Sequence, residues 1–318
     1  MKTNPLDQLE RICRQSLSRV AKLNKSFKKF FVETMICFLS IPGRINFSQM
    51  ARYGSSCESR FRQNFKKKFE WTKFNTAFTG QSDGHLRAIA IDPCFIPKSG
   101  KKTPGLAFDL VSRLRDDARL RYLYDGPKEN RRGRPKTFDG TVDVDNPRED
   151  RFVVSTVDDG DTKVTLYHAK LYAVCLKRVV GVAIAVYDDK DKKTQTRKIF
   201  FSTDLSLNGE QIYSLYRSRF QIEFLYRDGK QFTGLTDCQA RNENSLDFAF
   251  NASLTAVNIA KAFAKESGLN LSVESVKLLT HNAVVIQRVL SLSGKRPNLN
   301  LNQDNFKELL FYGVKFAA

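Results

Sequence analysis

The sequence predicts a mixed α/β protein with a basic helical module in residues 1–80 and a larger α/β domain in residues 85–318. Apolar residues recur at helical spacing near both ends of the chain, and runs rich in β-branched residues, separated by turn residues, fill residues 138–205. A hydrophobic fraction of 41% is enough for a folded core. We therefore expect helices, then strands, then helices again.

The chain carries 53 Lys and Arg against 34 Asp and Glu, for a net charge of +19 and a pI near 9.7. Such an excess is typical of proteins that bind nucleic acid. A membrane surface is the alternative partner, but no apolar run approaches the roughly 20 residues of a spanning helix, and residues 1–5 open no signal peptide. We expect a cytoplasmic protein without a membrane partner. Six cysteines form no Cys-x2-Cys pair and the three histidines lie far apart, so carboxylates must carry any chemistry.

Residues 1–80 hold 16 Lys and Arg against 5 Asp and Glu. Residues 31–41 predict a buried helix ended by Pro42 and Gly43, and residues 46–53 predict a short second helix. The stretch from Ser55 to Glu58 has a capping-box pattern that opens a third helix, with Phe61 and Phe65 on its inner side. That helix carries Arg60, Arg62, Lys66, Lys67 and Lys68. The pattern favours equally a helix-turn-helix DNA reader and a small bundle with a solvated basic face.

Residues 138–205 predict an antiparallel meander of four or five strands. The expected strands are residues 152–157, 163–168, 171–176, 179–187 and 197–203. Asp158 to Asp161 is a hairpin turn signal between the first two. The acidic turns are expected to be solvated loops.

The stretch from Gln211 to Lys230 predicts one helix, and Asn208 and Gln211 form a capping-box pattern at its start. With about 3.6 residues per turn, steps of three, four and seven place four residues on one narrow side. These residues are Tyr216, Arg219, Glu223 and Lys230. A solvated amphipathic helix is the simpler interpretation, but this set fits no simple i,i+4 pairing.

Those four residues and their spacing resemble the signature of bacterial insertion-sequence DDE transposases, the insertion-sequence-four family. The resemblance implies a ribonuclease-H-like catalytic core with an antiparallel β insertion, here residues 138–197, preceded by a helical DNA-binding module. It implies that Glu223 binds metal and that Tyr216, Arg219 and Lys230 contact phosphates of the transposon end. It further implies Mg²⁺ (or Mn²⁺) as cofactor, double-stranded DNA ends and target as partners, self-association on DNA, and cleavage followed by strand transfer.

Asp92 is the expected partner of Glu223. An apolar run from Arg87 leads to Asp92 and is followed by Pro93, which predicts a buried strand with the acid at its tip. The basic loop at residues 97–102 resembles the loop that follows the first Asp in the family. A turn Asp is the common alternative, but together with the Glu223 helix we expect Asp92 and Glu223 to be the catalytic, metal-binding pair.

The second Asp of the DDE set has no counterpart. A block of the family pattern is missing around Gly105, because the segment from Leu106 resembles the part that lies downstream of that Asp. The available substitutes are Asp109, Asp116, Asp117 and Asp204, and Asp204 is better explained as a turn residue. Two-metal catalysis needs ligands that hold two ions about 3.5–4 Å apart. An inactive DNA-binding relic is therefore the alternative function, and a structural nucleoid protein is a third.

Residues 131–136 read Arg-Arg-Gly-Arg-Pro-Lys, the core of an AT-hook, in which arginines enter an A·T minor groove. The alternative is a flexible basic loop, and we expect Arg132 and Arg134 to contact DNA. Beyond the loop at residues 234–241, helices are expected at 245–267, where one should cover the sheet, and at 273–292, with a short apolar segment at 306–314.

Overall fold

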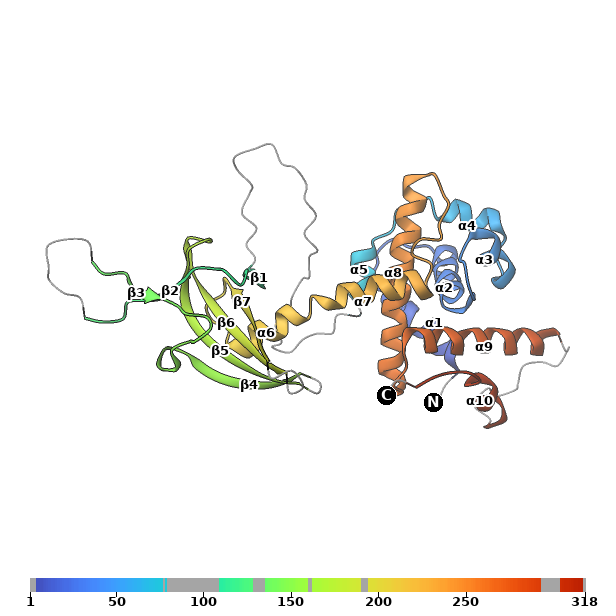
Figure 1. Cartoon of the computed structure of the whole chain (residues 1–318). Coiled ribbons are helices and arrows are strands. Elements are labelled where there is room, and N and C mark those ends of the chain that lie inside the picture. Colours follow the sequence, from blue (N-terminus) through green and yellow to red (C-terminus); the bar gives the residue numbers. More distant parts are fainter. Residues whose placement is uncertain are drawn as a thin grey trace. The chain divides into compact units, whose positions relative to one another are not determined.

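The computed structural model describes residues 4–76, 78, 109–127, 135–159, 162–189, 194–292 and 304–316 (Figure 1). These residues group into two compact units. The helical unit takes its described residues from 1–87 and 222–318, and the sheet unit takes its described residues from 88–221. The sequence placed a boundary after residue 80, whereas here the first helices share a unit with the last ones. Among the described residues, no helix is long and apolar enough to cross a membrane.

Both ends of the chain supply the helices of the helical unit (Figure 1). Side-chain caps by asparagine start several of them, including Asn24, Asn46 and Asn242, each of which accepts a backbone N–H of the first turn. The helices that belong wholly to this unit are α1 (Pro5–Leu17), α2 (Lys25–Ser40), α3 (Phe47–Tyr53), α4 (Glu58–Asn64), α5 (Trp71–Asn75), α8 (Glu243–Ser267), α9 (Val273–Leu292) and α10 (Asp304–Leu310). The expected helices at residues 245–267 and 273–292 are confirmed.

Phenylalanines dominate the core of this unit. Phe30 of α2 packs its ring against Phe61, Phe65 and Phe248, with ring centroids 5.6, 6.2 and 6.4 Å away. Phe248 lies on α8, and α8 also contacts α1 and α9. The prediction that α8 covers the sheet is therefore wrong, because the apolar faces of the first helices bury it within the helical unit.

Glu33 explains how α4 begins. Its carboxylate accepts hydrogen bonds from the backbone N–H groups of Ser55 (2.6 Å) and Ser56 (2.7 Å) and from both hydroxyls. Both serines are thus hydrogen-bonded to a side chain of α2. The N-cap of α4 is Cys57, which makes no side-chain cap bond. The predicted capping box from Ser55 to Glu58 is wrong, because a distant carboxylate competes for its donors.

The sheet unit is built on a seven-stranded sheet in which every described strand pair is antiparallel. The strand order is β1-β7-β6-β5-β2-β3, and β4 pairs with β5 beside this path. The strands are β1 (Val111–Arg113), β2 (Leu120–Leu123), β3 (Phe138–Thr141), β4 (Val153–Asp159), β5 (Thr162–Ala173), β6 (Arg178–Asp189) and β7 (Thr194–Ser202), with a short 3-10 turn, η1, at Glu149–Arg151. The predicted meander is confirmed in β4 to β7, although β5 is one strand where two were expected.

Alternation along the central strands gives the sheet two apolar faces. Val182 and Ile184 of β6 point into one cluster, while Ala183 and Ala185 point into the other. The small alanines leave room for helix α6 (Gly209–Arg217), whose Ile212 and Tyr213 are buried on that second face. Figure 1 shows α6 beside β6 and β7, where it also contacts β5. This docking fixes the orientation of the side chains that α6 presents.

Candidate nucleic-acid interface

The predicted signature helix is two helices, not one. Helix α6 ends at Arg217, and α7 (Phe220–Phe232) begins three residues later. At the break, the hydroxyl of Ser218 donates to the carbonyl of Ser214 (3.0 Å), and Arg219 N–H bonds the carbonyl of Tyr216 (3.1 Å) in a tighter, 3-10 manner. The prediction of a continuous helix is therefore wrong, because the N–H groups of Arg219 and Gln221 bond carbonyls three residues back in place of four.

The four signature residues lie on both sides of the break. The Tyr216 ring packs against Phe200 of β7 in a tilted arrangement, with ring centroids 4.6 Å apart. The guanidinium of Arg219 lies 5.7 Å from the centre of the Tyr216 ring, so the structure brings these two together in the sheet unit. Glu223 is exposed in the first turn of α7, and Lys230 is exposed in its last turn. The border between the units falls inside α7, after residue 221.

Four polar side chains hold α6 on the sheet. The Tyr213 hydroxyl donates to Asp159 at the end of β4 (2.8 Å) and accepts from Tyr187 of β6 (3.3 Å). Arg217 makes an ion pair with the same Asp159 carboxylate. Burial raises the pKa of the Tyr213 phenol, so this group stays a donor at neutral pH. These residues position Tyr216, and they were not predicted from the sequence. The available signals were Tyr213, one turn before Tyr216, and Asp159, an acid in a predicted hairpin turn.

The acids proposed as metal ligands do not gather in the part of the chain that the structure describes. Asp92 lies outside the described residues. Asp204 accepts from the backbone and hydroxyl of Ser206 (2.8 and 2.7 Å), and the hydroxyl bond lowers its pKa, as expected of a turn residue. Asp109 accepts from Thr203, while Asp116 and Asp117 pair with neighbouring arginines. No described group of three His, Cys, Asp or Glu side chains could hold a metal ion.

The basic residues of α4 point in two directions. Arg60 donates to the Ser26 hydroxyl (3.4 Å), and the ammonium of Lys67 lies 5.5 Å from the centre of the Phe27 ring, both at the start of α2. Arg62 instead bonds Glu58 (2.9 and 2.5 Å) and lies over the Phe47 ring of α3 (5.0 Å). Lys66 and Lys68 follow the helix and are exposed. The expected basic surface therefore exists on α4 and its C-terminal turn, and it extends to α2.

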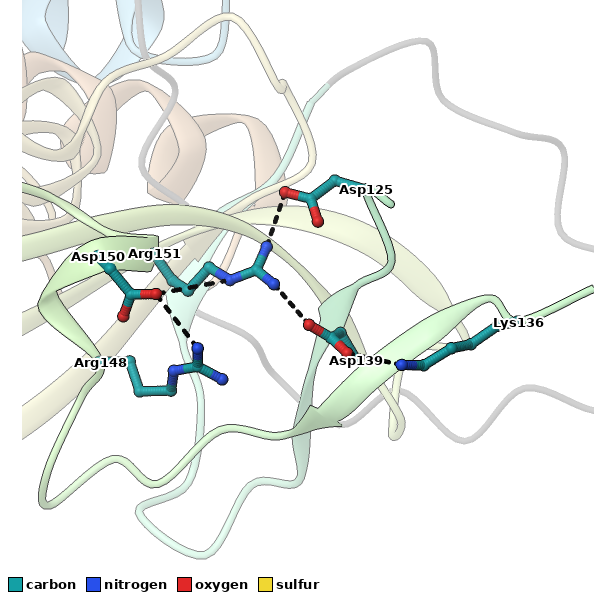
Figure 2. A network of polar contacts seen from close by, with 6 residues as sticks. All are labelled: Asp125, Lys136, Asp139, Arg148, Asp150 and Arg151. Atoms are coloured by element: carbon teal, nitrogen blue, oxygen red, sulfur yellow. Dashed lines mark hydrogen bonds and ion pairs between the residues drawn. The ribbon is translucent and has the colours of Figure 1, made fainter. Parts of the chain in front are cut away.

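The AT-hook-like residues Arg132 and Arg134 lie outside the described residues, but the strands on either side of them are described. Tyr124 N–H bonds the carbonyl of Thr137 (3.1 Å), which closes the base of the β2–β3 hairpin. Figure 2 shows Arg151 between two carboxylates of that hairpin, Asp125 (2.7 Å) and Asp139 (2.5 Å).

Further contacts extend this network. Lys136 bonds Asp139 (2.8 Å), and this bond lowers the pKa of that carboxyl, while Arg148 pairs with Asp150. Arg151 thus ties the hairpin base to η1.

One family model matches the chain. Residues 142–272, well under half of its length, match the DDE-type family described as archaeal putative transposase ISC1217. The matched stretch contains the meander strands β4 to β7 and helices α6, α7 and α8, and with them all four signature residues. No protein in the curated set matches. Over these residues the match supports a DDE-type transposase of an insertion sequence.

Proposed function

We propose that this protein is an insertion-sequence transposase that binds the ends of its element and carries out metal-dependent DNA cleavage and strand transfer. The observation that carries the proposal is the set Tyr216, Arg219, Glu223 and Lys230, which lies inside the stretch that matches a DDE transposase family. The net charge of +19 supports a polyanionic partner. Within this proposal the element is bacterial and of the insertion-sequence-four family, and the protein acts in the cytoplasm.

The proposed roles follow the chemistry of each side chain. Arg219 and Lys230 would neutralise phosphate, and Tyr216 would donate a hydrogen bond to it. Asp92 and Glu223 would hold Mg²⁺ or Mn²⁺ in a ribonuclease-H-like core, where a metal ion supplies an activated water. Only one of these two carboxylates is among the described residues, and the described residues do not by themselves make up a metal site.

The proposed DNA-binding module is residues 1–80, and the transposase domain is residues 85–318. The exposed cations of α4 support the first part, and the hairpin base held by Arg151 supports DNA contact by the intervening basic loop with Arg132 and Arg134. Because phosphate contacts and not bases dominate such surfaces, binding should weaken steeply as salt rises. Self-association on DNA belongs to this proposal, since strand transfer acts on two element ends.

A second candidate is an internally deleted relic that binds DNA without cutting it. Two observations favour it. By the family resemblance the chain lacks a block around Gly105, and the described acids that could replace the second Asp are engaged in turns or with arginines.

A strand-transfer assay on the flanking DNA of the gene tests both candidates. The wild-type chain, Glu223→Ala and the control Glu210→Ala are incubated with labelled end fragments in Mg²⁺ or Mn²⁺; Glu210 is an exposed acid of α6 outside the signature. Cleavage by the wild type and the control, but not by Glu223→Ala, supports the transposase. Tight binding by all three with no cleavage supports the relic. Absence of DNA binding in the wild type would overturn both.

A further inference from the structure

Two segments about 30 residues apart in the sequence share one basic surface in the helical unit. The α2–α4 basic surface consists of Lys25, Lys29, Arg60, Lys66, Lys67 and Lys68, all exposed. The contact of Arg60 with Ser26 and the position of Lys67 over Phe27 bring the start of α2 beside the end of α4. Phe27 and Phe69, whose ring centroids lie 5.9 Å apart, pack beneath them. The surface is therefore a fixed feature of the helical core.

The stretches of sequence that supply this surface contain no acidic residue. No Asp or Glu occurs between residues 11 and 32 or between residues 59 and 69. The acids that border these stretches are engaged elsewhere: Glu10 with Arg14, Glu33 with Ser55 and Ser56, Glu58 with Arg62, and Glu70 with Lys73. None of the six cations makes an ion pair with a residue that the structure describes. Like charges held this close repel one another, and a polyanion relieves that repulsion.

The composition of the surface favours phosphates over bases. Five of its six cations are lysines, which act as point charges, whereas base edges are most often read by Arg, Asn and Gln in planar pairs. Arg60 already donates to Ser26, and Arg62, the other arginine of α4, is bonded to Glu58. Lys25 and Lys29 are one helical turn apart, with Cβ atoms about 5–6 Å from each other, so they can reach separate phosphates of one strand.

We infer that the α2–α4 basic surface grips the DNA backbone without reading sequence, and that Lys25 and Lys29 at the start of α2 contact phosphates together with the α4 cations. The inference rests on the proposed DNA binding and specifies its mode. Part of the DNA contact is then made by α2, which the sequence predicted only as a buried helix, and not by the predicted recognition helix α4 alone. Sequence preference must then come from elsewhere in the chain.

The test compares two double variants of the full chain. Lys25→Gln/Lys29→Gln removes the proposed contacts, and Lys261→Gln/Lys265→Gln is the matched control, an exposed i,i+4 lysine pair on α8 of the same unit. Fluorescence anisotropy with an end fragment and a shuffled duplex of equal length is measured over a salt series. We expect the slope of log K against log salt to fall by about 1.8 in the first variant, since each phosphate contact contributes about 0.9, and to stay unchanged in the control. The loss should be equal on both duplexes.

Each of the other outcomes would contradict a specific part of the inference. If the wild type binds DNA and Lys25→Gln/Lys29→Gln keeps its slope, the inferred contact is wrong while DNA binding stands. A loss confined to the end fragment would show that the surface reads sequence. No binding by the wild type would remove both the inference and the proposed function. The helical circular dichroism signal checks that the variants are folded. The single variant Lys25→Gln is a milder substitution, and we expect it to change the salt slope by half as much as the double variant.

Discussion

Replacing Tyr213 by Phe should loosen α6 on the sheet and leave the helical unit unaffected. The substitution deletes one hydroxyl, which donates to the Asp159 carboxylate at 2.8 Å and accepts from Tyr187 at 3.3 Å. Hydrogen bonds to charged groups are worth about 1.5–3 kcal/mol. The side chain of Asp159 is 21% exposed and can regain some water, so we expect the lower end of this range, about 1.5–2 kcal/mol. Tyr216, one turn further along α6, should lose its fixed position on Phe200.

The two units can be followed separately in one urea titration. Trp71 is the single tryptophan and lies buried in the helical unit, so its fluorescence reports on that unit alone. Near-ultraviolet circular dichroism of tyrosine follows the sheet unit, which holds most of the described tyrosines. In Tyr213→Phe we expect the tyrosine transition to move to lower urea and the Trp71 transition to stay in place.

Tyr172→Phe is the matched control, because the Tyr172 hydroxyl makes no hydrogen bond with any residue that the structure describes. It should cost less than about 0.5 kcal/mol, as most neutral surface changes do. A loss in Tyr213→Phe as small as this control would refute the account of how α6 is held. Equal shifts of both transitions would refute the view that the units unfold separately.

Three further predictions concern other contacts. Glu33→Gln places an amide where four donors converge, so the Trp71 transition should lose about 2–3 kcal/mol. Gly209→Ala puts a Cβ 2.9 Å from the Cβ of His168, so the tyrosine transition should lose about 1–3 kcal/mol, and this loss should shrink in a His168→Gly background, which lacks that Cβ. Burial lowers the pKa of Lys277 from 10.5 to about 8. Between pH 8 and 10.5 the unfolded chain therefore binds more protons than the folded protein, and the free energy of unfolding rises with pH by at most about 1.4 kcal/mol per pH unit. Lys277→Met should lack this rise.

Outcomes that contradict these three predictions are equally concrete. An unchanged Trp71 transition in Glu33→Gln would mean that the serines find other partners. If Gly209→Ala costs as much in the His168→Gly background as in the wild type, the close approach is not the cause of the loss. Identical pH profiles of the wild type and Lys277→Met between pH 8 and 10 would show that the Lys277 ammonium is not desolvated.

The local parts of the fold could be predicted from the sequence. The helix at residues 273–292 and the meander strands follow from hydrophobic periodicity and turn residues, which act over a few residues. The capping box of Asn208 and Gln211 is present as expected, with bonds of 2.8 and 3.0 Å. In each case the determining contacts lie within the same segment.

Features that depend on distant partners could not be predicted. Ser55 and Ser56 look like caps until Glu33, more than 20 residues earlier, takes their N–H groups. Ser218 looks compatible with a continuous helix, and only the 3-10 hydrogen bonds of Arg219 and Gln221 mark the break between α6 and α7. For the site, sequence spacing identified Tyr216 and Arg219, but their support by Asp159 depends on where β4 ends in the sheet.

The core of the helical unit is formed by helices from both ends of the chain, and this affects how the protein folds during translation. Phe30 and Phe31 of α2 are made early, yet Phe248 and Phe263, which enclose them, leave the ribosome only after more than 200 further residues. Until then the nascent chain exposes a phenylalanine-rich face, to which chaperones can bind and through which chains can aggregate. Fragments ending before α8 should therefore be insoluble, and the cations at the start of α2 gain their fixed arrangement only in a finished polypeptide.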